Sequence, residues 1–407
     1  MLVGFSFKNF RSFYDDTSFH MEANSTETNL RELNTIEMPH GELLKSAVVF
    51  GANASGKSNF MRAFKYMKEV IISDGVNQRR LINAIELGHI FTWSEEQMEI
   101  SFEISFIFAD ELYRYGFAIL NGEVNEEYLY HVSNDVGAEE MLIFERTSPD
   151  FKDISFGSDT VMPTVRNLTS NTKRTNLFLY VANTLNDDLA ANVCLWFERT
   201  KENVSISGDE RLDYTNLAIN YLQKSERNKE DMLKMIKLAN PLIESLDIDK
   251  DGNYKVRLSQ REYTKEGRMT QVLRGYPLDY ESEGTQLMFG LSVTILNVLE
   301  NGSTLFIDEI DSSLHPLLVR HILNMFNSID QNPKGAQLIC TTHDALLLEE
   351  NLRRDQIYFT EKNEQGRSEL YSLIDFKNVE NTDKILKRYL VGSYGGVPKL
   401  REHLELI

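Results

Sequence analysis

Hydrophobic and polar residues alternate along much of the N-terminal third of the chain, which is the period of half-buried β-strands. Residues 1–20 read as a strand, a turn and a second strand, and residues 98–131 read as a β-meander. Residues 43–50 are different, because they end in the uninterrupted apolar run Ala47–Phe50. Such a short run is typical of a strand that is buried on both faces.

Helical spacing of apolar residues begins after this run. It predicts a helix over Lys57–Ile72 and a mostly helical stretch over 177–248, in which heptads are too irregular for a long coiled coil. Two strand candidates follow, and the last third then alternates helix 283–300, strand 304–307, helix 316–328 and strand 337–341. This rhythm predicts an α/β fold with a parallel sheet flanked by helices.

Gly51–Ser58 lies between the apolar strand and the first long helix, and it fits the pattern G-x-x-x-x-G-K-[ST] in full. Glycines allow successive N–H groups to point at phosphate oxygens, and the helix adds its positive N-terminal end. In this pattern Lys57 reaches the β- and γ-phosphates, and the Ser58 hydroxyl binds Mg²⁺. The segment therefore predicts a loop that binds the phosphates of a nucleotide.

Two later strands end in polar side chains of the kinds that act on a nucleotide. The strand 304–307 is followed by Asp308, a candidate Mg²⁺ ligand, and by Glu309, a candidate general base for water. The strand 337–341 is followed by His343, which can donate to a γ-phosphate or to water. Because α/β sheets bind ligands at the carboxyl ends of their strands, we expect these groups to meet the phosphate loop.

A third polar segment, Ser282–Gln286, opens the predicted helix 283–300. Ser282 is typical of a helix N-cap, and the turn would present a hydroxyl and N–H groups to an anion. An ordinary helix cap is the alternative interpretation of this segment.

Together these residues resemble the ABC-type ATPases of the SMC and RecF group. The order of phosphate loop, Ser282–Gln286 segment, Asp308–Glu309 and His343 covers almost the whole chain, and Phe7–Phe13 is similar to that group's opening strand. The resemblance implies an ABC-type P-loop ATPase head with mixed and parallel sheets, an N-terminal β-meander lobe and an inserted helical region. The closer likeness is to anti-phage ATPases such as RloA, AbiLi, the PARIS ATPase subunit and the ATPase half of OLD nucleases.

The resemblance also implies roles for individual residues. Glu309, His343 and Lys57 would be catalytic, and Ser58 and Asp308 would bind Mg²⁺. The nucleotide would be bound by Arg11, Ser12, Gly51, Asn53, Ala54, Ser55, Gly56, Lys57, Ser58, Asn59, Ser282, Gly284 and Gln286. ATPases of this group dimerise head to tail, so that Ser282 and Gly284 of one subunit would close over the phosphates at Lys57 of the other.

Three lobes are expected: 1–180 with the phosphate loop and the meander, a helical insertion over 181–250, and 251–407 with Asp308–Glu309, His343 and Ser282–Gln286, which resembles the family's signature motif. The chain departs from the family pattern in two places. The first is the Q-loop glutamine, which has no clear counterpart here; Gln97 is the nearest candidate. The second is the pair Glu281 and Glu283, which flank Ser282 at positions where transporters carry Leu and Gly. No acidic cluster of the Toprim kind follows Asp308–Glu309, so we expect no nuclease in the same chain.

Charge and cysteine content limit the partners and the compartment. The 43 basic and 62 acidic residues give a net charge of −19, so any nucleic-acid contact must be local or made by a partner. The chain opens without the pattern of a signal peptide and has no apolar run long enough for a membrane span. The two isolated cysteines, Cys194 and Cys340, favour reduced thiols and a cytoplasmic protein.

Four functions stay open at this point. The first is the ATPase switch of an anti-phage system that acts with a separate effector. The second is a RecF-like DNA-binding ATPase, for which Arg79–Arg80 and Lys384, Lys387 and Arg388 are local basic candidates, although a solvated helix face explains them as well. The third is a nucleotide-binding scaffold with little turnover. The fourth, a transporter ATPase, is disfavoured by the long insertion between Lys57 and Ser282.

Overall fold

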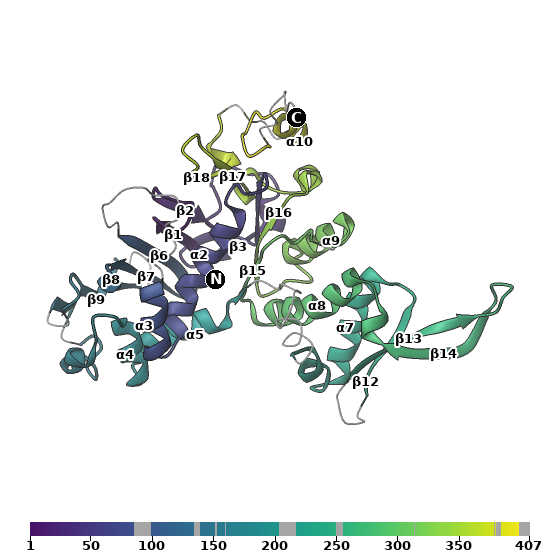
Figure 1. The fold of residues 1–407 in the computed structure, drawn as a ribbon, viewed down its shortest axis with the longest axis horizontal. Coiled ribbons are helices and arrows are strands. Elements are labelled where there is room, and N and C mark those ends of the chain that lie inside the picture. Colours follow the sequence, from purple (N-terminus) through teal and green to yellow (C-terminus); the bar gives the residue numbers. More distant parts are fainter. Residues whose placement is uncertain are drawn as a thin grey trace, which may run out of the picture.

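The computed structural model describes residues 1–84, 99–133, 139–150, 153–158, 160–202, 217–249, 255–312, 314–377, 379 and 384–398. Two large sheets occupy one side of the molecule, and a smaller sheet extends from the other side (Figure 1). The fold is mixed α/β, as the sequence predicts. Within the described residues, no helix combines the length and the apolar content that a membrane crossing requires.

The first sheet has seven antiparallel strands and contains the meander that the alternating pattern predicts. Phe102, Ile104 and Phe106 alternate on its buried face, whereas the residues between them are half-buried. The strands follow the order β10 (Ile154–Phe156), β9 (Met141–Arg146), β8 (Glu123–Val132), β7 (Glu111–Leu120), β6 (Ile100–Phe108), β1 (Leu2–Lys8) and β2 (Thr17–His20).

The second sheet has six strands, of which the first five are parallel and the last is antiparallel to its neighbour. Its order is β11 (Lys201–Glu202), β15 (Thr304–Ile307), β16 (Gln337–Thr342), β5 (Ser46–Gly51), β17 (Ile357–Lys362) and β18 (Ser368–Ser372). The apolar run over 47–50 is thus an inner strand, and it joins segments that are far apart in sequence.

Helices cover both faces of this second sheet, which explains the uninterrupted apolar run. Ala47 and Val49 of β5 belong to the core on the side of α2 (Lys57–Ile72), whereas Val48 and Phe50 belong to the core formed with α8 (Glu283–Asn301) and α9 (Pro316–Asn327). The helix α2 also packs on the first sheet, and the ring of Phe64 stacks on that of Phe306 at a centroid distance of 3.8 Å. This helix therefore joins the two sheets.

Shorter elements complete these two layers. The helices are α1 (Arg31–Asn34), α3 (Gly75–Ala84), α4 (Phe178–Thr184), α5 (Asp188–Arg199) and α10 (Ile385–Leu390). A two-stranded sheet is formed by β3 (Thr35–Met38) and β4 (Gly41–Leu44). Five 3₁₀ helices occur in the described residues: η3 (Arg166–Asn171), η4 (Leu278–Tyr280), η5 (Ala345–Glu349), η6 (Arg354–Gln356) and η7 (Leu373–Asp375).

A third group of elements has a core of its own. It consists of α7 (Glu226–Ala239) and the antiparallel sheet of β12 (Ile243–Asp249), β13 (Lys255–Tyr263) and β14 (Met269–Pro277), packed on α8. The prediction of a mostly helical stretch to residue 248 is wrong at its end. Asn240 precedes Pro241, which disfavours further helix, and the following residues pair as a strand with β13. The lobe boundaries at 180 and 250 stay predictions.

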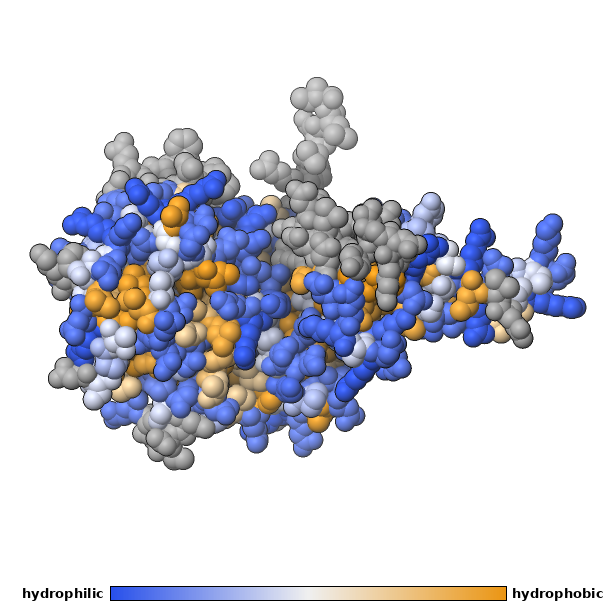
Figure 2. Space-filling view, turned by 90° about the horizontal axis from the view of Figure 1, so that it is seen from below, coloured by the Kyte–Doolittle hydropathy of each residue, from blue (hydrophilic) through white to orange (hydrophobic). Residues whose placement is uncertain are grey.

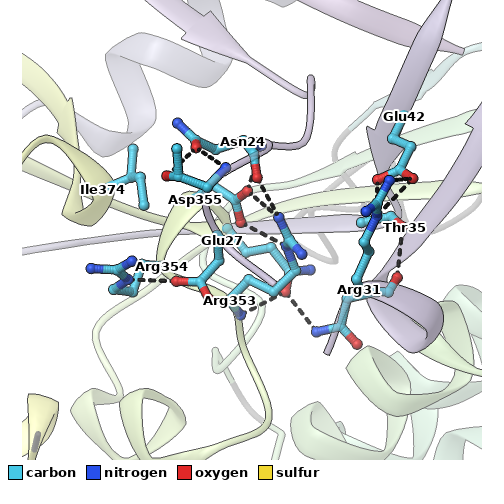
Figure 3. Close-up of polar contacts among 12 residues, drawn as sticks. Asn24, Glu27, Arg31, Thr35, Glu42, Arg353, Arg354, Asp355 and Ile374 are labelled. Atoms are coloured by element: carbon cyan, nitrogen blue, oxygen red, sulfur yellow. Dashed lines mark hydrogen bonds and ion pairs between the residues drawn. The ribbon is translucent and has the colours of Figure 1, made fainter. Parts of the chain in front are cut away.

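A buried ion pair fastens the segment around residue 24 to the start of β17 (Figure 3). Arg353 is 1% exposed, and its Nη2 lies 2.6 Å from Oδ2 of Asp355. The same Asp355 oxygen accepts from the backbone N–H of Asn24 at 2.8 Å, and Arg353 donates to the Asn24 carbonyl at 3.2 Å. Because both charges are paired and hydrogen-bonded, their burial is tolerated.

Candidate functional site

The phosphate loop connects β5 to α2 through two glycines that a larger residue could not replace without strain. A Cβ on Gly51 would lie 2.5 Å from Oγ1 of Thr360 and 2.6 Å from the Thr360 carbonyl oxygen. Gly56 has a φ of 132°, and its Cβ would lie 2.5 Å from Oγ of Ser368. Ala54 adopts a left-handed φ of 61°. The backbone here is drawn tightly around the end of β17 and the start of β18, which leaves Asn53 and Ala54 exposed to solvent.

Lys57 begins α2 and folds its side chain back over the loop. Its Nζ donates to the carbonyl of Gly51 at 2.6 Å and to that of Ala52 at 3.0 Å. Only 4% of the residue is exposed. Burial lowers the pKa of Lys57 to about 8, although the charges of Glu309, Asp308 and Asp311 act in the opposite direction. The amine is therefore held at the mouth of the loop, close to the carboxylates that follow β15.

A buried threonine fixes the two carboxylates that follow β15. The Thr341 hydroxyl, on β16, donates to Oδ1 of Asp308 at 2.6 Å and accepts from the backbone N–H of Glu309 at 2.7 Å. Glu309 has a left-handed φ of 50°, a conformation that costs energy in a residue other than glycine. The hydroxyl thus holds a strained backbone in which the Glu309 side chain is 48% exposed and can reach a ligand.

His343 lies between the lysine and the glutamate. Its Nδ1 is 3.2 Å from Nζ of Lys57, and its Nε2 is 3.5 Å from Oε1 of Glu309. The His343 backbone N–H donates to the carboxylate of Asp311 at 3.1 and 3.3 Å. With Lys57 as a donor to Nδ1, the ring proton is on Nε2 and faces Glu309. The structure therefore brings together residues from the ends of β5, β15 and β16, as the sequence predicts.

The opening segment supports the phosphate loop from outside. The Ser12 hydroxyl accepts from Nδ2 of Asn59 at 2.7 Å, lies 2.8 Å from Oγ of Ser368, and belongs to a residue that is 2% exposed. Ser368 also donates to the carbonyl of Ser55 at 2.6 Å. Arg11 is exposed, with a left-handed φ of 54°. Ser12 and Asn59 are thus engaged in positioning the loop, whereas Arg11 is exposed to solvent.

Hydrogen bonds within its own turn help to hold the Ser282–Gln286 segment. Ser282 is the N-cap of α8, and its hydroxyl accepts from the backbone N–H of Thr285 at 3.2 Å. Gln286 donates to the Glu281 carbonyl at 2.7 Å. The Glu281 carboxylate accepts from Asn240 and Tyr276. The acid that departs from the family pattern is therefore held by α7 and β14, and the exposed face of the turn carries Ser282.

Sequence patterns missed the residues that support this site. Thr341, Thr360 and Ser368 were not singled out, because a buried threonine or serine in a strand is common and its partners come from distant segments. A weak signal exists for Thr341, which directly precedes the Thr342–His343 pair. The resemblance to ABC-type ATPases also implies a D-loop at residues 312–315, in which His315 accepts from the Leu317 N–H as the N-cap of α9.

Two of the predictions fall outside the described residues: the Q-loop candidate Gln97, and Ser313 of the expected D-loop. Among the residues that the structure describes, no group of three or more His, Cys, Asp or Glu side chains could hold a metal ion. A Mg²⁺ site would need oxygen donors from Ser58 and Asp308 together with those of a nucleotide.

Comparisons with known proteins give a family and a set of remote structures. No curated protein matches the chain. One similar solved structure is that of an SMC head bound to the C-terminal winged-helix domain of ScpA, with 13% identity, a TM-score of 0.44, and coverage of 91% of this chain and 97% of that one. A second is an SMC head with an extended coiled coil, bound to the C-terminal domain of ScpA from Pyrococcus furiosus, with 11% identity, a TM-score of 0.43 and coverage of 91% and 96%.

A family model matches residues 46–349, which is well over half of the chain and includes every group of the site from Lys57 to His343. The protein therefore belongs to the family of AAA domains described as putative AbiEii toxin of type IV toxin–antitoxin systems.

Proposed function

We propose that the protein is an ATP-binding and ATP-hydrolysing switch of a prokaryotic anti-phage defence system, and that it acts with a separate effector such as a nuclease or toxin. The observation that carries the ATPase part is the convergence of Lys57, Asp308, Glu309 and His343 at one edge of the parallel sheet. The description of the family as part of a toxin–antitoxin system supports the defence role. The proposal places the protein in the cytoplasm.

The geometry suggests a different role for each of these residues. Loop N–H groups and Lys57 would bind the phosphates, for which the glycines and the buried amine are suited. Glu309 would accept a proton from a water that attacks the γ-phosphorus, while the bond to the β–γ bridging oxygen breaks and ADP leaves. His343 would donate its Nε2 proton to a γ-phosphoryl oxygen. Ser58 and Asp308 offer the oxygen donors that Mg²⁺ prefers, and the ion would neutralise phosphate charge.

A composite site in a head-to-tail dimer would give the Ser282–Gln286 segment a role in nucleotide binding. Ser282 and Gly284 of one subunit would contact the phosphates bound at Lys57 of the other, and α8 would contribute its positive N-terminal end. The hydrogen bonds of Glu281 to Asn240 and Tyr276 reduce the repulsion that an acid next to the γ-phosphate would cause. Glu283, on the other side of Ser282, is exposed.

The mass of the protein in solution, with and without ATP and Mg²⁺, tests this proposal. We expect Glu309→Gln to lose turnover and to accumulate an ATP-dependent dimer or larger particle, because the general base is removed while binding is retained. Glu364→Gln, which makes the same change in an exposed turn, serves as the control and should behave as the wild type. If neither the wild type nor Glu309→Gln responds to ATP in mass or hydrolysis, the composite-site proposal is wrong.

The effector requires a separate test. Co-expression with the product of the neighbouring gene should give a stable complex and protection against phage, and Lys57→Ala should abolish that protection. The absence of both a complex and a defence phenotype would contradict the switch proposal while leaving the ATPase assignment intact. A RecF-like role in repair is the alternative, and it predicts DNA binding that depends on ATP.

A further inference from the structure

The hairpin of β13 and β14 forms a ribbon that projects from the body of the molecule (Figure 1). At its base it is the continuation of a three-stranded sheet, in which β12 pairs with residues 255–260. Beyond that point only β13 and β14 pair with each other, and nearly all of residues 261–274 whose exposure is described are solvent-exposed. Two-stranded ribbons of this kind gain little stability from packing, so a function in contact with a partner would explain why one is retained.

The base of the ribbon is braced, whereas its tip is a tight turn. Tyr276 and Gln260, on the two strands, both contact the Glu281 carboxylate next to α8. At the tip, the N–H of Thr264 donates to the Arg268 carbonyl at 2.8 Å, and Gly267 has the φ of 75° that such a turn requires. The ribbon is thus a defined arm with a fixed base rather than a loose loop.

The ribbon reverses the charge of the rest of the protein. Residues 255–277 contain six of the 43 Lys and Arg residues but only two of the 62 acidic ones, in a chain of net charge −19. Arg261 forms an ion pair with Glu244 at 2.9 Å. Lys265, Arg268 and Arg274 are exposed, and no ion pair is found for them within the described part of the chain. Lys265 and Arg268 are therefore available at the tip, and Arg274, which pairs with Gln260, is available near the base of the ribbon.

Exposed apolar side chains accompany these cations. Tyr263 and Met269 lie opposite each other in the strand register and are 53% and 56% exposed, and Leu273 is 50% exposed. In Figure 2 the projecting arm is mostly hydrophilic, with small hydrophobic patches. Ribbons that enter a DNA groove combine two kinds of side chain: cations that contact phosphates and other groups that contact base edges. The β13–β14 ribbon carries cations for the first role and apolar groups for the second.

We propose that the β13–β14 ribbon is an arm that binds double-stranded DNA, with Lys265, Arg268 and Arg274 contacting phosphates and the tip entering the major groove. A two-stranded ribbon fits the major groove of B-form DNA, which is about 12 Å wide, but not the narrow major groove of A-form RNA. Arg268 directly precedes β14, and Arg274 lies six residues further along the chain, or about 20 Å away, so the two can reach phosphates on different parts of a duplex. The acidic remainder of the protein would confine the contact to this arm.

The test is the affinity of the full chain for a short DNA duplex of arbitrary sequence, measured by fluorescence anisotropy without nucleotide. Three phosphate contacts predict a log–log salt slope near −2.7, so that the affinity should fall about 40-fold between about 50 and 200 mM salt. Lys265→Glu/Arg268→Glu should weaken binding at low salt at least tenfold and reduce that salt effect to about fourfold. Because both side chains are exposed, the unfolding transition should not change.

Arg79→Glu/Arg80→Glu is the matched control, since it makes the same change in charge on exposed residues of α3. We expect its DNA affinity to stay within about threefold of that of the wild type. The proposal is wrong if the wild type does not bind DNA at low salt, or if this control loses as much affinity as the ribbon variant. Equal or tighter binding to an RNA duplex of the same sequence would overturn the choice of DNA. Because no nucleotide is used, these outcomes are independent of the proposed ATPase function.

Discussion

Replacing Thr341 by valine should show what its hydroxyl contributes, because the change leaves the carboxylates of Asp308 and Glu309 in the chain. The change keeps the shape of a fully buried side chain but removes its hydrogen bonds to Asp308 and to the Glu309 N–H. A hydrogen bond to a charged group contributes about 1.5–3 kcal/mol and a neutral one about 0.5–1.5 kcal/mol. We therefore expect the free energy of unfolding to fall by about 2–4 kcal/mol.

The effect on hydrolysis should be larger than the effect on binding. Without the hydroxyl, the strained backbone of Glu309 can relax, and the carboxylate leaves the position from which it would act as general base. A positioned base contributes about 10²–10⁴-fold, so we expect kcat to fall about 100-fold with little change in the Kd of ATP.

Thr341→Ser is the control for this experiment, because it keeps the hydroxyl and loses one methyl group, at a cost of about 1 kcal/mol. Denaturant unfolding and a steady-state ATPase assay would be run on both variants. If the valine and serine variants have kcat values within about threefold of each other, the hydroxyl does not position Glu309 and the reasoning is refuted.

Three further predictions concern the loop, the lysine and the buried ion pair. Gly51→Ala should lower the free energy of unfolding by about 1–3 kcal/mol, because the new Cβ would clash with β17. Gly275→Ala is the control and should leave the free energy of unfolding unchanged, since its Cβ would meet no atom closer than 3.7 Å. Equal losses in the two variants would contradict the packing argument. ATP affinity should fall as the pH rises through about 8, because the pKa of Lys57 lies there and only the charged amine pairs with phosphate. If calorimetric titrations give the same Kd for ATP below and above that pH, the charge of Lys57 does not contribute to binding. Asp355→Ala should cost about 3–5 kcal/mol of unfolding free energy by leaving Arg353 buried and unpaired, and a loss below about 1 kcal/mol in denaturant unfolding would show that the arginine finds another partner.

The sequence predicts the parts of this fold that depend on local patterns. The strand over 46–51, the helix over 57–72 and the helix–strand alternation around Asp308 are confirmed, because each carries a long periodic or uninterrupted apolar run. The meander is confirmed for the same reason. The strand over 243–249 was missed, since a short stretch with three apolar residues fits either period and only pairing with β13 decides it.

The sequence predicted the polar groups that the structure brings together at the sheet edge, but it missed the groups that hold them in place, and the chemical roles of the former stay predictions. Lys57, Glu309 and His343 are recognisable from residue type and position after a strand. Thr341 and Ser368 act through partners that lie far away in sequence, so no local pattern identifies them. The roles of Arg11 and Ser282 in nucleotide binding stay predictions.

The interior position of β5 has a consequence for the synthesis of the protein. Both neighbours of this strand, β16 and β17, begin at or after residue 337, and the loop that follows it is closed by Ser368. A nascent chain that has emerged only as far as α8 therefore carries a six-residue apolar strand whose two edges are unpaired. The nucleotide pocket cannot form until almost the whole chain has left the ribosome, and until then this apolar strand is open to aggregation and to binding by a chaperone.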